Sequence, residues 1–205
     1  MRVAAFADLH GRLPEAPPAC DLLVLAGDAC ALEPADRQRA WVEAELRPWL
    51  ARAGEASKAI VAVAGNCDVA FAEDPSLPRS LPWLYLDGEA AEIAGLAVFG
   101  SPLALPFGRW PFMAPEERLA EVWASVPETT ELLVVHGPPH GLGDLVAGGA
   151  HAGSTSLRRR LGELPRLRAV VFGHIHEARG RGTVGSVEWV NAAAPGGEEP
   201  WLLDV

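Results

Sequence analysis

Hydrophobic residues in this chain gather in short runs that are separated by polar and glycine-rich segments. The runs are rich in Val, Leu, Ile and Phe and cover residues 3–7, 22–26, 59–64, 96–100, 132–136, 169–172 and 187–191. Continuous apolar runs of this length, bounded by turn residues, are typical of strands that are buried on both faces. The pattern therefore predicts a protein built around β-sheet.

Two of the intervening segments have the signals of helices. Residues 36–47 follow a proline, with Asp36 as the expected N-cap, and Pro48 is expected to kink or end this helix. Residues 115–125 open with a proline and two glutamates, a composition that favours the first turn of a helix. Both segments therefore interrupt the strands with helical structure.

A third helix is predicted over residues 155–164, with Ser154 as its N-cap. The first half of the chain thus alternates strands and a helix, as parallel strands joined by crossovers do. Residues 83–100 and 183–204 instead resemble consecutive short strands with glycine turns. This order predicts an α/β (α+β) fold in which two sheets pack face to face with helices outside. No linker divides the chain, so we expect a single domain over residues 1–205.

Composition narrows the range of functions. The net charge of −10 argues against stable binding to nucleic acid or to an anionic membrane, because both need a basic surface. No apolar run approaches the roughly 18 residues of a membrane helix, and no secretory leader is expected at the start of the chain. The three cysteines form no CxxC pair, which favours a reducing cytoplasm over a disulfide framework. The sequence does not decide whether the protein forms a homo-oligomer.

Polar side chains with metal-binding chemistry stand where the apolar runs end. They are Asp8, His10, Asp28, Asn66, His136, His174 and His176. The carboxyl ends of parallel strands meet at one edge of a sheet, so these side chains are expected to come together. In Asp8-x-His10 and His174-x-His176, the spacing can direct both side chains to the same side of an extended segment. Carboxylate, imidazole and amide ligands suit Mn, Fe or Zn.

These motifs, in this order, resemble those of the calcineurin-like metallophosphoesterase superfamily. The motifs are Asp-x-His, Gly-Asp, Gly-Asn-x-Asp, His-Gly and Gly-His-x-His, and they run from residue 8 to residue 176. Further segments, at residues 100–102, 136–139, 172–177 and 191–192, resemble the small metallophosphoesterase-domain-containing proteins. The third motif, Gly65-Asn66-Cys67-Asp68, resembles that of small bacterial and archaeal phosphodiesterases. The resemblance implies a four-layer double β-sandwich flanked by helices, which agrees with the pattern of apolar runs.

The resemblance also implies a site with two divalent metal ions, for which Mn is favoured in vitro. By this similarity Asp8, His10 and His176 hold the first metal. Asn66, His136 and His174 hold the second, and Asp28 bridges the two. Asn66 and His136 are further expected to orient a phosphoryl oxygen of the substrate. Asp68 is expected to brace the loop that carries Asn66.

Position 67 departs from the common family pattern. The third motif usually contains a histidine that is taken to protonate the leaving group, and here this residue is Cys67. A thiol, whose unperturbed pKa is about 8.5, replaces an imidazolium poorly. His140 and His151 lie in glycine-rich loops, and either could contact the substrate or supply the proton; an exposed loop histidine is the simpler interpretation of each. Residues 107–112 could wall a pocket and stack on a base, although packing of a long loop onto the core is favoured.

The resemblance indicates a metal-dependent phosphoric ester hydrolase, with a phosphodiesterase favoured. Two metals about 3.5–4 Å apart can activate a shared hydroxide for in-line attack on phosphorus. The expected partner is a small phosphoester, with nucleotides among the candidates. The alternatives are a phosphomonoesterase and a catalytically weak protein of the same fold that binds protein partners. A DNA-processing nuclease is less favoured, because this short, acidic chain has no capping domain.

Overall fold

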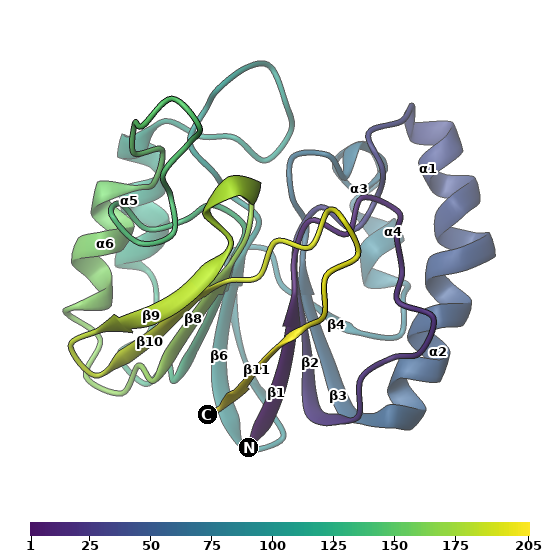
Figure 1. Ribbon diagram of the computed structural model, residues 1–205, viewed down its shortest axis with the longest axis horizontal. Coiled ribbons are helices and arrows are strands. Elements are labelled where there is room, and N and C mark those ends of the chain that lie inside the picture. The colour runs from purple at the N-terminus through teal and green to yellow at the C-terminus, as the bar shows by residue number, and fades with distance from the viewer.

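Two β-sheets packed face to face form the centre of the protein (Figure 1). The computed structural model describes all 205 residues. The first sheet has the strand order β11-β1-β2-β3-β4. Its strands are β1 (Arg2–Phe6), β2 (Cys20–Ala26), β3 (Ser57–Val63), β4 (Leu84–Tyr85) and β11 (Trp201–Asp204). They are parallel except for β11, which pairs antiparallel with β1.

The second sheet has the order β5-β6-β7-β8-β10-β9. Its strands are β5 (Glu89–Ile93), β6 (Leu96–Ser101), β7 (Leu132–Val135), β8 (Ala169–Phe172), β9 (Gly180–Val184) and β10 (Val187–Asn191). The inner strands β6, β7, β8 and β10 are parallel, and each edge is closed by an antiparallel hairpin. Both sheets therefore present the carboxyl ends of several strands at one edge.

All seven predicted apolar runs form strands. The remaining four strands lie in sheet edges or are very short, so their sequences carry little apolar signal. β5 and β9 are largely exposed, and β4 has only two residues. A strand that packs against nothing on one side needs no apolar run, which is why its bounds cannot be found from hydrophobicity alone.

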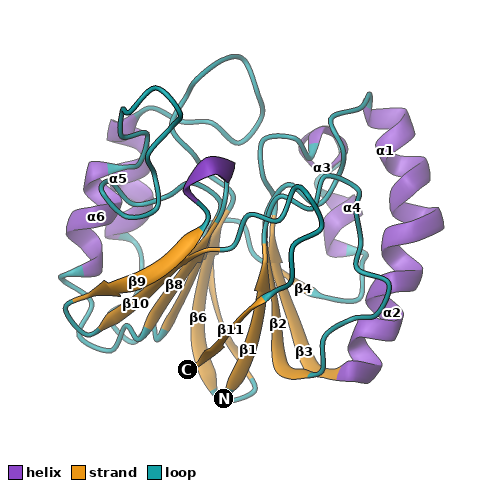
Figure 2. Cartoon of the chain, in the orientation of Figure 1, coloured by secondary structure: helices purple, strands orange, loops and turns teal.

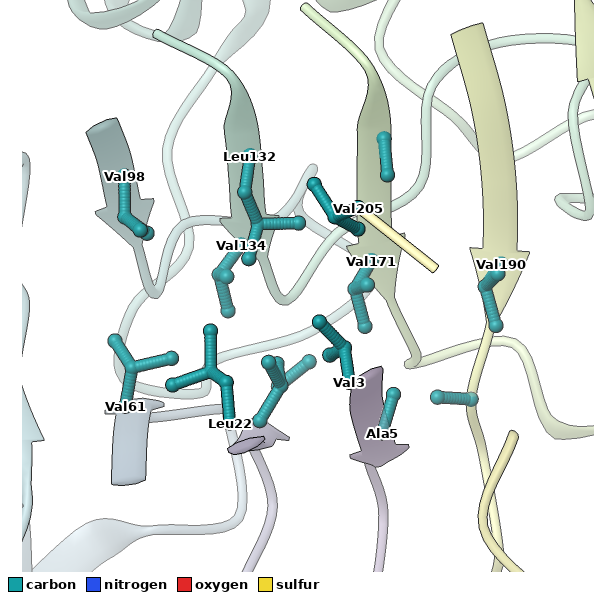
Figure 3. Close-up of a cluster of buried hydrophobic side chains, with 14 of the residues drawn as sticks. Val3, Ala5, Leu22, Val61, Val98, Leu132, Val134, Val171, Val190 and Val205 are labelled. Carbon is teal, nitrogen blue, oxygen red and sulfur yellow. The ribbon is translucent and has the colours of Figure 1, made fainter. Parts of the chain in front are cut away.

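Valine, leucine and alanine side chains of both sheets fill the space between them (Figure 3). Val3 and Val61 of the first sheet meet Val98 and Val134 of the second, and all four are almost completely buried. Burying a valine fully contributes roughly 1.5–3 kcal/mol. This shared core fixes one sheet against the other.

Helices cover the outer face of each sheet (Figure 1). Against the first sheet lie α1 (Ala35–Trp41), the π-helical turn Val42–Leu46, α2 (Arg47–Ala56), α3 (Val69–Glu73) and α4 (Ser76–Arg79). Against the second lie α5 (Glu116–Ala124) and α6 (Thr155–Leu161). The predicted four-layer double β-sandwich is confirmed. None of the helices combines the length and the apolar character that crossing a membrane requires.

The prediction for the first helix was wrong in part. Of the two effects expected of Pro48, it does not end the helix, because α2 continues to Ala56. The chain forms a π-helical turn just before the proline, where the N–H of Arg47 donates to the carbonyl of Val42, five residues earlier. Such a turn shifts the hydrogen-bonding register and makes room for a ring that has no N–H. Asp36 is not the N-cap either, because α1 already begins at Ala35 without a side-chain cap.

The predicted N-cap of the third helix is confirmed. Ser154 Oγ accepts a hydrogen bond from the N–H of Leu157 at 3.1 Å, as an N-cap serine does. The carboxylate of Glu116, at the start of α5, accepts further hydrogen bonds from the N–H of Ser156 at 2.6 Å and from Thr155 Oγ1 at 2.8 Å. The first turns of α5 and α6 are thus tied together.

Loops at the carboxyl ends of the parallel strands gather at one end of the molecule, opposite the two chain termini (Figure 2). The N- and C-termini lie side by side, where the amino group of Met1 donates to the carbonyl of Val205 at 2.7 Å. The predicted metal-binding residues follow β1, β2, β3, β7 and β8. The fold therefore directs them to a common region between the two sheets.

Candidate metal centre

The first group of side chains at this end consists of Asp8, His10 and His176. One ligand atom from each lies within 4.8 Å of the other two. Nε2 of His10 and Nε2 of His176 are 3.1 Å apart, and Oδ1 of Asp8 is 3.3 Å from the latter nitrogen. The structure thus brings together the residues predicted for the first metal.

A second group adjoins the first and shares Asp8 with it. Asp8, Asp28 and His136 again offer ligand atoms within 4.8 Å of one another. Nε2 of His136 is 3.6 Å from Oδ2 of Asp28 and 3.1 Å from Oδ1 of Asn66. Nδ1 of the same ring is 3.0 Å from the carbonyl of Ala26. Donation from Nδ1 to this carbonyl leaves Nε2 with a free lone pair aimed at the centre.

His174 joins the second group from the side. Its ring lies 5.0 Å from that of His136, and its backbone N–H donates to Oδ2 of Asp8 at 2.8 Å. Burial, together with the neighbouring positive potential of His136, lowers the pKa of His174 to about 3. The imidazole is therefore neutral at physiological pH, the form in which it can bind a metal.

Cys67 also faces this centre. Its sulfur, one oxygen of Asp28 and one nitrogen of His10 form a third group within 4.8 Å. The N–H of Cys67 donates to Oδ1 of Asp28 at 2.7 Å, and Nδ2 of Asn66 lies 3.3 Å from its sulfur. Burial, followed by the negative charge of Asp28, raises the pKa of the thiol well above its usual value. At neutral pH the side chain is therefore a neutral thiol in this structure.

The backbone at the centre adopts a conformation that the sequence did not reveal. The φ angles of Asp8, His10, Asp28 and His174 are 55°, 45°, 53° and 71°. Residues other than glycine rarely occupy this left-handed region, and such strain concentrates at functional sites. The expectation that Asp8 and His10 share a side through an extended segment was therefore wrong. A tight turn brings the two side chains together instead.

Glycines beside the ligands keep space for them. A methyl group at Gly65 would overlap Oδ1 of Asp28, and one at Gly173 would overlap Oδ2 of Asp8. Since the carboxylates approach the backbone this closely, only glycine fits at either position. The Gly-Asn and Gly-His pairs in the sequence thus have a steric cause.

Two buried side chains hold the loop that carries Asn66. Asp68 accepts hydrogen bonds from the N–H groups of Cys30 and Gly65, each at 2.8 Å, as expected for a bracing residue. Burial, followed by the charge of Asp28, raises the pKa of Asp68 to about 6. Gln38 was not predicted: its Nε2 donates to the carbonyl of Cys67 at 2.6 Å. Gln38 is the only glutamine in the chain, and this rarity was the one feature of the sequence that could have indicated its role.

Asn191 has the same role on the other sheet. Its Nδ2 donates to the carbonyl of Gly143 at 2.9 Å and to that of Ile175 at 2.8 Å, between the two histidines of the last motif. Its Oδ1 accepts from the N–H of Ala193 at 3.1 Å. All the amide atoms of this fully buried side chain are thus used to fix loops at the centre.

The donor set at the centre fits divalent cations. Oδ1 of Asp8 is fully buried and makes no hydrogen bond of good geometry. Burial alone would raise the pKa of Asp8, but interaction with His176 and the other histidines lowers it, so the carboxylate stays ionised. A buried anion without a hydrogen-bond partner, facing imidazole nitrogens, is stabilised by a cation placed between them. Oxygen and nitrogen ligands of this kind suit Mn, Fe or Zn.

The two loop histidines lie outside these groups but next to each other. The rings of His140 and His151 are 4.9 Å apart. Nδ1 of His151 is 2.7 Å from Oδ1 of Asp144, whose carboxylate is almost fully buried and also accepts from the N–H of Gly153 at 3.0 Å. Asp144 therefore orients the imidazole of His151 and leaves Nε2 of that ring free. Contact of His140 or His151 with a substrate remains a prediction.

Matches to known proteins agree with this geometry. A family model described as calcineurin-like phosphoesterase matches residues 1–178. Human metallophosphoesterase domain-containing protein 1 is 28% identical over 220 residues, which cover 94% of this chain and 65% of the human protein. A probable rhamnogalacturonate lyase C from Emericella nidulans is 30% identical over 201 residues, or 90% of this chain and 18% of that protein. The chain thus spans less than two thirds of the length of either relative.

Two solved structures share the fold. A dimetal phosphatase from Danio rerio aligns over 93% of this chain and 86% of its own, with a TM-score of 0.57 and 13% identity. GAP50, described as the anchor in the inner membrane complex of Plasmodium, aligns over 96% of this chain and 72% of its own, with a TM-score of 0.54 and 11% identity. At such low identity the similarity concerns the arrangement of strands and helices.

Proposed function

The chain belongs to the calcineurin-like phosphoesterase family, and we propose that it is a two-metal phosphodiesterase acting on small phosphoesters. The observation that carries the proposal is the completeness of the donor set. Five of the seven predicted ligands, Asp8, His10, Asp28, His136 and His176, belong to groups whose ligand atoms lie within 4.8 Å of one another, while Oδ1 of Asn66 lies 3.1 Å from Nε2 of His136 and the ring of His174 lies 5.0 Å from that of His136. A set of this kind is costly to bury unless cations fill it.

Each metal would have its own set of ligands. Asp8, His10 and His176 would hold one metal, and Asn66, His136 and His174 the other, with Asp28 between them. Bound divalent metals lower the pKa of a water molecule and stabilise negative charge on a phosphoryl group. The chain itself fixes the ligands: Asp8 accepts from the backbone N–H of His174, and Asp28 accepts from that of Cys67. Preorganised ligands need no rearrangement during the reaction.

Accessibility of the ligands sets where a substrate could bind. The side chains of His176 and His10 are 40% and 21% exposed, whereas that of His136 is fully buried. A phosphoryl group would therefore approach from the side of His10 and His176. Asn66 is only 5% exposed, so a substrate would have to reach its side chain through the same opening.

The preference for diesters rests on the resemblance of Gly65-Asn66-Cys67-Asp68 to the third motif of the bacterial and archaeal phosphodiesterases. The choice of leaving group is a separate matter: a neutral thiol with a raised pKa is a weak proton donor, so esters with good leaving groups should suffer least from the missing histidine. His151, oriented by Asp144, and its neighbour His140 are the alternative proton donors. Nucleotides are among the candidate substrates, and a phosphomonoesterase is the nearest alternative activity.

A protein-binding role is the alternative from another class. GAP50, which shares the fold, is described as an anchor, so this architecture also occurs in a protein with such a role. The complete donor set favours catalysis here, because surface binding would not require it. Protein binding without catalysis would leave the metals dispensable.

The test is hydrolysis by purified protein supplied with Mn²⁺. We expect turnover of bis(p-nitrophenyl) phosphate to exceed that of p-nitrophenyl phosphate, and to be lost in Asn66→Ala. Hydrolysis of neither ester above the Asn66→Ala background would refute the proposal, and faster hydrolysis of the monoester would favour the alternative activity.

The same assay addresses the proton donor. If Cys67 occupies the position of leaving-group protonation, Cys67→His should raise turnover of esters with poor leaving groups by about 100-fold or more, the lower end of the range for a general acid. Esters of p-nitrophenol should change less. An unchanged rate with both kinds of ester would assign protonation to His140 or His151 instead.

A further inference from the structure

An apolar pocket opens directly beside the metal ligand His174. It has a volume of about 380 Å³ and is lined by residues of three separate loops. Leu105 and Phe107 come from the loop after β6, Val146 and Ala152 from the loop before α6, and His174 from the loop after β8. Because His174 forms part of its wall, the pocket adjoins the candidate metal centre.

Phe107 is the most unusual residue in this wall. Its side chain is 64% exposed, the largest exposed fraction among the bulky hydrophobic residues of the chain. Its ring lies 5.2 Å from that of His174 with an interplanar angle of 51°. Aromatic rings at this distance attract each other, and the outer face of Phe107 remains open for another ring.

The loop that carries Phe107 is held at its base. The N–H of Ala104 donates to the carbonyl of Phe112, and the N–H of Ala114 donates to the carbonyl of Ala104, both at 3.0 Å. Phe112 itself packs against the core beside the first sheet. The two interpretations of residues 107–112 thus each hold for one phenylalanine: Phe112 packs the loop, and Phe107 walls a pocket.

The wall opposite Phe107 is also fixed. The N–H of Ala147 donates to Oε1 of Glu177 at 2.7 Å, and the N–H of Ala152 donates to the carbonyl of Asp144 at 3.0 Å. The first bond ties the loop of Val146 and Ala152 to the turn that contains His176, and the second holds the loop to itself. The pocket is therefore formed by anchored loops on both sides.

The side chains that line this pocket disfavour a charged substituent in it. No Lys, Arg, Asp or Glu lines the pocket, and its only polar side chain is the imidazole of His174. A group that enters must therefore be uncharged and largely apolar, because nothing there would compensate the lost hydration of a charge. A dry cavity of about 150 Å³ already accepts benzene, so this pocket has room for one or two fused rings.

We propose that this pocket binds an aromatic group on the ester arm that stays on phosphorus, stacked on Phe107, while the phosphate occupies the metal centre. The inference rests on the proposed phosphodiesterase function and names its substrate class: phosphodiesters whose retained arm carries an uncharged aromatic group, such as an aryl or nucleobase-bearing ester.

Two diesters with the same leaving group test the proposal. The metal-loaded protein is assayed with p-nitrophenyl phenyl phosphate and p-nitrophenyl methyl phosphate, and kcat/KM is divided by the rate of alkaline hydrolysis of each ester. We expect a phenyl preference of about fivefold or more, the lower limit for stacking on an aromatic side chain. Phe107→Ala should abolish the preference, which is measured as the ratio of the two corrected kcat/KM values within each variant.

Trp110→Ala is the matched control. Trp110 lies in the same loop and is 36% exposed, but it does not line the pocket. The control variant should keep the phenyl preference. Equal preference in wild type, Phe107→Ala and Trp110→Ala would overturn the inference while leaving phosphodiesterase activity itself established.

A binding measurement keeps the inference testable if neither ester is hydrolysed. Titration calorimetry with diphenyl phosphate and dimethyl phosphate compares the same substituents without turnover. Tighter binding of diphenyl phosphate to wild type than to Phe107→Ala would support the pocket even though the proposed function had failed. Indistinguishable binding of the two phosphates, or no effect of the substitution, would overturn it.

Discussion

Replacement of the buried residue Gln38 by leucine is expected to lower the stability of the protein. Gln38 is 2% exposed and lies on α1. Its Nε2 donates to the carbonyls of Ala31 and Cys67, at 2.8 and 2.6 Å, and its Oε1 accepts from the N–H of Ala70 in the first turn of α3 at 2.8 Å. Leucine has a similar size, so the substitution removes these bonds without leaving a large cavity.

The magnitude follows from the groups that lose their partners. A buried polar group left unsatisfied costs about 1–3 kcal/mol. The three backbone groups will recover part of this through small shifts or entry of water, so we expect a loss of about 2–4 kcal/mol in the free energy of unfolding. This is a large fraction of the roughly 5–15 kcal/mol that stabilises a typical domain.

Urea unfolding, followed by the fluorescence of the tryptophans, measures the effect. Arg37→Ala is the matched control, because Arg37 lies on the same helix and its side chain is 72% exposed in an ion pair with Glu33. The control should lose less than about 1 kcal/mol, as exposed pairs do. A loss below about 1 kcal/mol in Gln38→Leu, with an unchanged denaturant slope, would show that the bonds of Gln38 do not stabilise this loop.

Two further substitutions probe the metal centre and the contact between α5 and α6. Asp8→Asn should weaken Mn²⁺ binding to the metal-free protein by more than roughly 10–100-fold, which is the cost of losing a residue that only supports a ligand. Calorimetry measures the binding, and the surface substitution Asp36→Asn should leave it unchanged. Glu116→Gln should lower stability by about 1–2 kcal/mol at neutral pH. Partial burial would raise the pKa of Glu116, but hydrogen bonds from Ser156 and its neighbours lower it. Its contribution is therefore present above the unfolded pKa near 4.5 and lost as pH falls through the folded value. A variant deficit that stays constant as the pH falls from neutral until the carboxylate is fully protonated would contradict this assignment.

Two physical reasons made the inner strands and the convergence of the ligands predictable. Strands buried on both faces need continuous apolar runs, and parallel strands must end at a common edge. Asp28 and His136 belong to different sheets but follow such runs, so the sequence placed them at the centre correctly. Edge strands such as β9 lack this signal because solvent covers one side of them.

Local backbone geometry could not be predicted in the same way. Asp8 and His174 adopt left-handed conformations because the surrounding structure holds them there, and their residue types do not require it. Local sequence alone does not specify these conformations. The π-helical turn before Pro48 differs, because the proline that it accommodates is visible in the sequence.

The scarce amide side chains connect these local features with the shared core. The chain contains only three: Asn66, Gln38 and Asn191. All are buried, and all act at the centre: Asn66 as a predicted ligand, Gln38 as a brace on the first sheet and Asn191 as a brace on the second. An amide offers a donor and an acceptor without charge, so it can bind two backbone segments beside a metal centre and add no net charge to it.

Each half of the centre thus has its own brace, and neither of these two amides spans the two halves. The distance between the ligands of the two sheets then depends on the few hydrogen bonds that cross between them, such as that from the N–H of His174 to Asp8, and on the valines and leucines packed between the sheets. Packing in this core is rigid enough to transmit a change of one methylene. The spacing of the two predicted metal sites is therefore a property of the hydrophobic core as much as of the ligands themselves.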